Sequence, residues 1–178
     1  YGRIINAKHY HRLLHLLEAE SSYIGGEHDD ASGRIAPALL DHATLESPCM
    51  QEEIFGPLLP ILAFRHYADA LRIIEQHPTP LALYLFSDPY NYEARRLFLT
   101  HVRFGGGCIN DTIVHLATNH MGFGGTGTSG MGSYHGKAGF YTFTHEKSIL
   151  DKALYPDLPI RYQPYNKLKD SFIKFFMK

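Results

Sequence analysis

Met50-Gln51-Glu52-Glu53-Ile54-Phe55-Gly56-Pro57 places two adjacent carboxylates, an aromatic ring and a Gly-Pro turn directly before an apolar segment, 58–64. The apolar segment predicts a buried strand. Proteins of the α/β class place ligand-binding groups at the mouths of their strands. The glutamate pair is therefore a candidate binding element, and the alternative is a solvated pair of charges ahead of a strand.

The segments on either side of this motif alternate between strand and helix patterns. Runs of apolar residues predict strands at 35–40, 58–64, 81–86 and 102–109. Helical spacing and capping residues predict a helix after Asn6, one over 68–76 and one opened by Asp88-Pro89. The alternation predicts an α/β fold in which helices flank an open parallel sheet.

The C-terminal part of the chain predicts two further elements. Residues 147–154 fit a last strand, so we expect a main domain over 1–160 and a tail over 161–178. The tail alternates lysine with apolar residues over 168–178, which predicts a short amphipathic helix. We expect that helix to dock on the domain or on a second subunit, and binding to a membrane surface is the alternative.

The composition predicts a folded domain. Of 178 residues, 44% are apolar and 20% are charged, which argues against disorder. The net charge of −1 and the absence of a Lys/Arg stripe argue against nucleic-acid binding. We see no secretory leader and no apolar run of the roughly 20 residues that a membrane span needs. The two cysteines, Cys49 and Cys108, favour a reducing, cytoplasmic compartment.

Three further motifs accompany the glutamate pair: 1–5 before it, 80–87 after it, and a long glycine-rich motif made of 106–115 and 123–137. With these four motifs the chain resembles the aldehyde dehydrogenase superfamily, from Tyr1 to about Arg161. Gly132-Ser133-Tyr134-His135-Gly136 is most similar to the class 3, fatty-aldehyde-like branch of that superfamily. The resemblance implies that the chain is the C-terminal part of a catalytic domain.

The resemblance also implies a reaction. Members oxidise aldehydes to carboxylic acids with NAD or NADP through a cysteine thiohemiacetal and thioester. The nucleophilic cysteine, the general-base glutamate, the oxyanion-hole asparagine and the dinucleotide-binding domain lie upstream of the matched segment. We therefore assign no catalytic residue in this chain and expect the fragment alone to be inactive. Members form homodimers or larger assemblies, and the segment near 146–154 joins an intersubunit sheet.

Five residues of this chain match the binding motifs of the family. The resemblance implies that Glu53 accepts hydrogen bonds from the ribose next to the nicotinamide, and that Phe55 packs near the nicotinamide. A carboxylate suits the first role because its two oxygens engage vicinal hydroxyls together. Asn110, His115 and Phe123 are expected to border the aldehyde substrate. For His115, a half-buried structural histidine is an equal alternative.

Several other patterns are interpreted as structural. Gly122-x-Gly124-x-x-Gly127 matches the dinucleotide fingerprint but precedes a segment, 133–144, without helical period. His11 and His15 have zinc-type spacing, but a solvated helix face explains them, so we expect no metal site. Cys49 and Cys108 lie outside the nucleophile's motif. Two other hypotheses stay open: a non-catalytic binding module of this fold and, more remotely, a hydrolase using Ser129.

Overall fold

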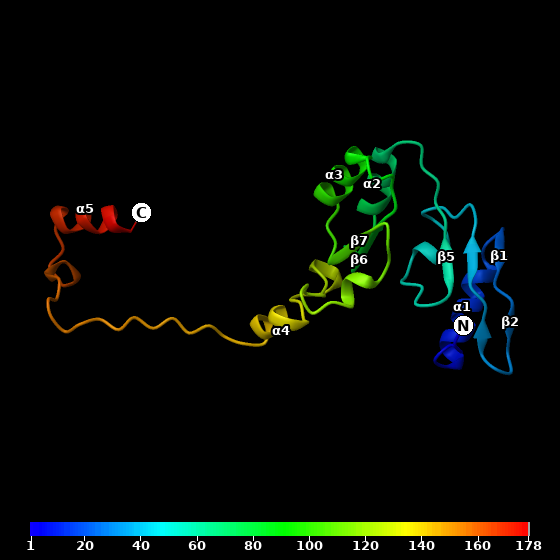
Figure 1. Ribbon diagram of the computed structural model, residues 1–178, viewed down its shortest axis with the longest axis horizontal. Helices are drawn as coiled ribbons and strands as arrows, with labels where there is room; N and C mark the ends of the chain where they lie inside the picture. Colours follow the sequence, from blue (N-terminus) through cyan, green and yellow to red (C-terminus); the bar gives the residue numbers. More distant parts are fainter. Residues whose placement is uncertain (178) are drawn as a thin grey trace. The chain divides into compact units, whose positions relative to one another are not determined.

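The computed structural model describes residues 1–177 and divides into two units, Tyr1–Phe143 and the segment that begins at Thr144 (Figure 1). The first unit combines helices with small sheets that contain parallel strand pairs. The predicted α/β class is therefore confirmed.

The first helix, α1 (Ala7–Glu18), begins where the sequence predicts. The Asn6 side-chain oxygen accepts a hydrogen bond from the His9 amide at 2.9 Å, which satisfies one free donor of the first turn. The inner face of the helix buries Tyr10, Leu13, Leu16 and Leu17. Helix α1 thus supplies much of the first core.

A three-stranded sheet lies against α1. Its strands are β1 (Tyr23–Gly25), β4 (Ala38–Leu40) and β5 (Leu58–Pro60), in the order β1-β4-β5. Strand β4 is antiparallel to β1 and parallel to β5. The core between this sheet and α1 contains Ile35, Ala38, Leu40, Ala43, Cys49 and Leu58, together with the four α1 residues.

The strand predicted at 35–40 is interrupted. Strand β3 (Arg34–Ile35) pairs with β2 (His28–Asp29) in a hairpin, whereas β4 begins at Ala38 and belongs to the other sheet. Pro37 lies between the two strands and has no N–H to donate to a ladder, which explains the break.

A second core forms around the next β-α-β unit. Strands β6 (Ala82–Leu85) and β7 (Gly106–Ile109) are parallel, and α3 (Tyr92–His101) connects them. Helix α2 (Tyr67–Glu75) precedes β6 and contacts α3. The buried residues of this core are Ala70, Ala94, Phe98 and Val102.

Two details of this unit differ from the prediction. Helix α3 is capped by Asn91, whose side chain accepts from the Ala94 amide at 3.1 Å. The Asp88 side chain instead accepts from the Tyr90 amide at 2.8 Å, so Asp88-Pro89 forms a turn before the helix. The nearly continuous apolar run at 81–86 favours a strand buried on both faces, but all four residues of β6 are half-buried.

The parallel pairs β4/β5 and β6/β7 belong to separate sheets among the described residues, so the single open sheet is not formed by this chain alone. An apolar run predicts that a strand exists, but it does not specify which strand pairs with it. Pairing is decided by long-range hydrogen bonds that leave no local signal.

The rest of the first unit is built from short helices: η2 (Val114–Leu116), η3 (Gly127–Ser129) and α4 (Gly136–Thr142). The prediction of no helix within 133–144 was wrong, because α4 forms there. Helix α4 buries none of its residues, so the apolar period that normally reveals a helix is absent from its sequence.

The second unit contains η4 (Pro159–Arg161) and α5 (Lys167–Phe176). The predicted tail helix is confirmed as α5. The Asn166 side chain caps it by accepting a hydrogen bond from the Lys169 amide at 2.9 Å. Lys178, the last residue of the predicted helix, lies outside the described residues. Residues 147–154 form no strand here, because none of residues 1–177 pairs with them. A strand completed by another subunit stays a prediction.

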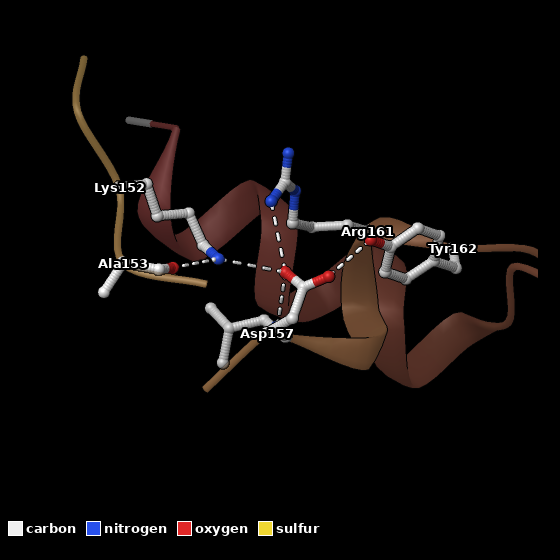
Figure 2. A network of polar contacts seen from close by, with 6 residues as sticks. Lys152, Ala153, Asp157, Arg161 and Tyr162 are labelled. Atoms are coloured by element: carbon white, nitrogen blue, oxygen red, sulfur yellow. Dashed lines mark hydrogen bonds and ion pairs between the residues drawn. The ribbon is translucent and has the colours of Figure 1, made fainter. Parts of the chain in front are cut away.

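Asp157 organises the polar contacts of this second unit (Figure 2). Its Oδ1 accepts from Lys152 Nζ at 3.3 Å, Arg161 Nη1 at 3.2 Å and the Leu158 amide at 3.0 Å, and its Oδ2 accepts from the Tyr162 hydroxyl. The Tyr162 hydrogen bond, followed by Lys152, lowers the pKa of Asp157 to about 2. Asp157 is therefore ionised at neutral pH.

No helix within residues 1–177 has the length and apolar character to cross a membrane.

Candidate functional site

The two adjacent glutamates have different surroundings. Glu52 Oε1 accepts from Arg12 Nη1 at 2.8 Å. Glu53 is exposed, and within residues 1–177 its carboxylate makes no hydrogen bond or ion pair. Glu52 therefore acts as a neighbour that is already paired, and Glu53 is the carboxylate that is free to accept hydrogen bonds from a ligand.

Arg12 projects from α1 and contacts the motif on both sides of Glu53. Its Nη1 donates to Glu52, and its Nη2 donates to the Ile54 carbonyl oxygen at 2.5 Å. The sequence prediction missed this role, because residues 11–15 fit a solvated helix face. Only tertiary packing brings Arg12 to residues that lie about forty positions further along the chain.

The Gly-Pro turn fits closely against α1. A Cβ added to Gly56 would lie 2.5 Å from Leu13 Cδ2, so no other residue fits there without displacing the core. The Pro57 carbonyl then accepts from the Ala38 amide at 2.8 Å, and Leu58 is buried as β5 begins. The turn therefore joins the exposed glutamate to a rigid strand and helix.

Phe55 presents its ring to solvent in an uncommon backbone conformation. Its φ is +49°, in the left-handed region, and the residue is 84% exposed. The ring borders a hollow of about 610 Å³, lined by residues 1–5, His9, Phe55 and Gly56. That volume lies within the roughly 300–1,000 Å³ of small-molecule sites. An exposed aromatic ring next to a free carboxylate suits a ligand that combines a planar ring with hydroxyl groups.

Asn110 closes the ends of β6 and β7. It also has a left-handed backbone, with φ of +58°. Its Oδ1 accepts from the Ser87 amide at 2.7 Å, and its own amide donates to the Leu85 carbonyl at 2.9 Å. The side-chain oxygen of Asn110 is thus already hydrogen-bonded within the fold. The residue nevertheless remains exposed at the carboxyl end of β7.

His115 is buried, with 6% of its surface exposed, which is deeper than the half-buried alternative. Its Nδ1 lies 3.5 Å from Cys108 Sγ, and its Nε2 has no partner among the described residues. The imidazole packs edge-on to Tyr84 and tilted to Phe123, each with ring centroids 5.7 Å apart. The structure therefore brings His115 and Phe123 together beside β6 and β7.

The aromatic cluster continues from Phe123 to the segment before α4. Phe123 and Tyr134 exchange two backbone hydrogen bonds of 2.9 Å, and their ring centroids lie 5.8 Å apart. The sequence prediction missed Tyr84 as a neighbour of His115 and Tyr134 as a neighbour of Phe123. The signal that was available is the glycine content of β7, since a Cβ added to Gly106 would approach the imidazole to 3.3 Å.

The other candidate groups have structural surroundings. Burial, followed by a hydrogen bond with Glu20, raises the pKa of the Cys49 thiol to about 11, so it stays protonated. Ser129 Oγ donates to the carbonyls of Thr126 at 3.0 Å and Pro80 at 3.3 Å, which holds the loop and does not prepare a nucleophile. Within the described part of the chain, no three His, Cys, Asp or Glu side chains are grouped to hold a metal ion.

Comparison with protein families gives one decisive match. Residues 1–149 match the aldehyde dehydrogenase family. The chain belongs to the aldehyde dehydrogenase family. Its resemblance to the class 3 branch is also confirmed, because the relatives include aldehyde dehydrogenase family 3 member A2 of Rattus norvegicus. The two are 42% identical over 179 residues, which cover 99% of this chain and 37% of the relative.

Two further relatives are informative. The chain is 51% identical over 180 residues to the 4,4'-diaponeurosporen-aldehyde dehydrogenase of Staphylococcus aureus, covering 100% of this chain and 39% of the relative. It is 44% identical over 154 residues to the dimeric NADP-preferring aldehyde dehydrogenase of Bos taurus, covering 86% of this chain and 64% of that protein. The chain therefore spans about 39% of the length of the first of these relatives.

The solved structures agree with this assignment. A substrate-bound Staphylococcus aureus AldH superimposes with a TM-score of 0.87 and 49% identity, over 100% of this chain and 39% of that one. An NAD-dependent aldehyde dehydrogenase from Sinorhizobium meliloti gives a TM-score of 0.78 at 24% identity, over 88% of this chain and 32% of that one. The second likeness shows the fold alone.

Proposed function

We propose that this chain is the C-terminal portion of an NAD(P)-dependent aldehyde dehydrogenase that oxidises aldehydes to carboxylic acids. The observation that carries the proposal is the free, exposed carboxylate of Glu53, in a turn fixed between α1 and β5. The chain's share of its relatives, about 39% of the first, supports a larger enzyme that contributes the remaining parts.

The geometry fits the binding of a nicotinamide ribose. The two oxygens of the Glu53 carboxylate accept hydrogen bonds from two vicinal hydroxyls, which fixes the orientation of the sugar. The exposed ring of Phe55 lies two positions further on and packs beside the nicotinamide. When bound, the cofactor supplies the hydride acceptor.

The chemical step requires a nucleophile and a general base that we do not assign to residues of this chain. A cysteine thiolate adds to the aldehyde carbon, hydride leaves that carbon, and water then displaces the thiolate to release the acid. Cys49 does not fit the nucleophile, because its thiol stays protonated. Cys108 lies outside the nucleophile's motif of the family. We therefore propose that the cysteine and its general base belong to the part of the enzyme upstream of this segment.

Asn110, His115 and Phe123 form the proposed substrate side of the site. The rings of His115 and Phe123 pack together with centroids 5.7 Å apart, and they would form an apolar wall beside the substrate. The unpartnered Nε2 of His115 is a polar group within that wall, and Asn110 holds the strand ends at its border.

We also propose that the enzyme is a cytoplasmic homodimer. A bovine relative is named dimeric, which supports the assembly. The segment 146–154 supports it further, since Ile149, Leu150 and Leu154 are each at least 78% exposed in the single chain. The two free cysteines fit a reducing compartment.

The test replaces Glu53 with glutamine in the full-length enzyme. Glu53→Gln keeps the size of the side chain but removes its charge, so we expect the KM for NAD(P)+ to rise about tenfold or more, as for the loss of a charge-assisted hydrogen bond. Glu46→Gln, at another exposed glutamate with a side chain that makes no hydrogen bond among residues 1–177, is the matched control.

Unchanged cofactor kinetics in Glu53→Gln would exclude the proposed role of that residue. A separate assay uses residues 1–178 alone, for which we expect no NAD(P)-dependent aldehyde oxidation. Robust oxidation by that segment would contradict the assignment of the nucleophile to another part of the enzyme.

A further inference from the structure

We propose that Arg12 is a positioning residue for Glu53, acting through the side chain of Glu52 before it and the backbone carbonyl of Ile54 after it. The proposal rests on the proposed function, in which Glu53 binds the ribose of the cofactor. Arg12 does not touch the cofactor in this scheme. It determines where the Glu53 carboxylate lies and keeps the neighbouring carboxylate of Glu52 paired.

The first argument is the lack of other backbone support for the loop. Residues 52–56 lie between η1 (Pro48–Met50) and β5 and make no backbone–backbone hydrogen bond with the described chain. The bond from Arg12 Nη2 to the Ile54 carbonyl, at 2.5 Å, is the hydrogen bond that ties the backbone of this segment to a helix. Without it, the loop around Glu53 loses that anchor to α1.

The second argument is the shape of the arginine side chain. A guanidinium presents donors in a fixed planar fork, so one group can engage a carboxylate and a carbonyl at the same time. Here Nη1 donates to Glu52 and Nη2 to Ile54, the residues immediately before and after Glu53. The fork therefore restrains Glu53 from both directions.

The third argument separates positioning from stability. The side chains of Arg12 and Glu52 are 23% and 50% exposed, and ion pairs near the surface contribute little to folding. The fold next to the loop is already held by Leu13, which packs on Gly56 and is fully buried. The main effect of losing Arg12 is therefore expected at Glu53 and not on the global fold.

The experiment measures NAD(P)+ kinetics and thermal unfolding of full-length Arg12→Met, Arg12→Lys, Glu53→Gln and the double variant Arg12→Met/Glu53→Gln. We expect Arg12→Met to raise the cofactor KM about tenfold, the loss typical of one charged hydrogen bond, with little change in Tm. Lysine can restore only one of the two contacts, so Arg12→Lys should recover part of the loss. Arg72→Met is the control, because Arg72 pairs with Asp69 on α2, away from the motif.

The double variant decides whether Arg12 acts through Glu53. If it does, Arg12→Met/Glu53→Gln has nearly the same KM as Glu53→Gln alone, because the second change has nothing left to disturb. Additive losses would overturn the positioning role. An unchanged KM in Arg12→Met, alongside a raised KM in Glu53→Gln, would also overturn it and leave the proposed function intact.

Glu52→Gln keeps the test decisive if Arg12→Met does not fold. This variant removes the ion pair but leaves the Arg12 bond to Ile54, so we expect a loss of about threefold, smaller than that of a full anchor. If cofactor KM is unchanged in both Glu52→Gln and Arg12→Lys, the inference is wrong. No effect in any variant, Glu53→Gln included, would instead remove the proposed function itself.

Discussion

The two units of the chain use their apolar residues in opposite ways. In the first, residues 1–143, two clusters of side chains are buried around α1 with β4 and β5, and around α3 with α2. In the second, none of residues 144–177 is buried. Even the large apolar side chains of Leu150, Leu154 and Leu168 are each at least 80% exposed.

The difference shows that apolar content does not by itself make a core. Large exposed apolar surfaces are costly in water and normally mark contacts with another surface. The first unit buries two clusters of apolar residues within the chain, although others, such as Ile5 and Phe55, stay more than 80% exposed. The second unit leaves its own exposed, which supports the proposed assembly with a second copy of the chain.

The largest expected effect comes from breaking the first core. Leu13 is fully buried and packs against the glutamate turn, so Leu13→Ala should lower the free energy of unfolding by about 2–5 kcal/mol, from lost burial and a cavity. Urea unfolding of the full-length protein measures this. Leu99→Ala, on the exposed side of α3, is the control and should cost about 1 kcal/mol or less.

The next effect concerns assembly. Ile149→Lys places a charge in the exposed apolar segment near 146–154, so we expect the dimer to dissociate at about 30-fold higher protein concentration, as for an interface residue worth 2 kcal/mol or more. Sedimentation velocity over a range of concentrations measures this. A dimer that persists unchanged would show that this segment lies outside the interface.

Thiol reactivity gives a smaller contrast, within the first unit. Cys49 is buried with a raised pKa, whereas Cys108 is half-buried, so iodoacetamide should label Cys108 first. Peptide mass spectrometry after timed labelling identifies each site. Faster labelling of Cys49 would mean that the core around it opens more readily than the end of β7.

The smallest effect is local to the second unit and depends on pH. Folding lowers the pKa of Asp157 from 3.8 to about 2. The contribution of this carboxylate to the stability of the second unit is therefore fully present above about pH 4 and is lost as the pH falls toward 2. The protection factors of the Leu158 and Arg161 amides, which are the exchange rates corrected for the intrinsic effect of pH, should therefore fall over that range. Asp157→Asn should show the low protection factors already at neutral pH.

Local patterns predicted much of the fold correctly. The cap at Asn6 and the apolar spacing after it give α1, and lysines alternating with phenylalanine give α5. Helix α4 escaped prediction because it buries no side chain and so carries no apolar period. The pairing of the strands was not predicted either, because a run of apolar residues does not specify which strand will pair with it.

The candidate site divides in the same way. Glu53, Phe55, Asn110, His115 and Phe123 could be named because they fall in motifs of a known family. The contact between Cys108 and His115, and the burial of that histidine, required the tertiary structure. Residues that meet across many positions of the chain leave no mark on either segment alone.

The sequence by itself determined the family, the helices with strong caps and the two-glutamate motif, because each depends on residues close together in the chain. Only the tertiary structure decided which of the two glutamates is free. Arg12 lies on a helix with no local link to that motif, and the packing of α1 against β4 and β5 brings its guanidinium to Glu52 and Ile54. Long-range packing therefore leaves Glu53 as the carboxylate that can serve a cofactor.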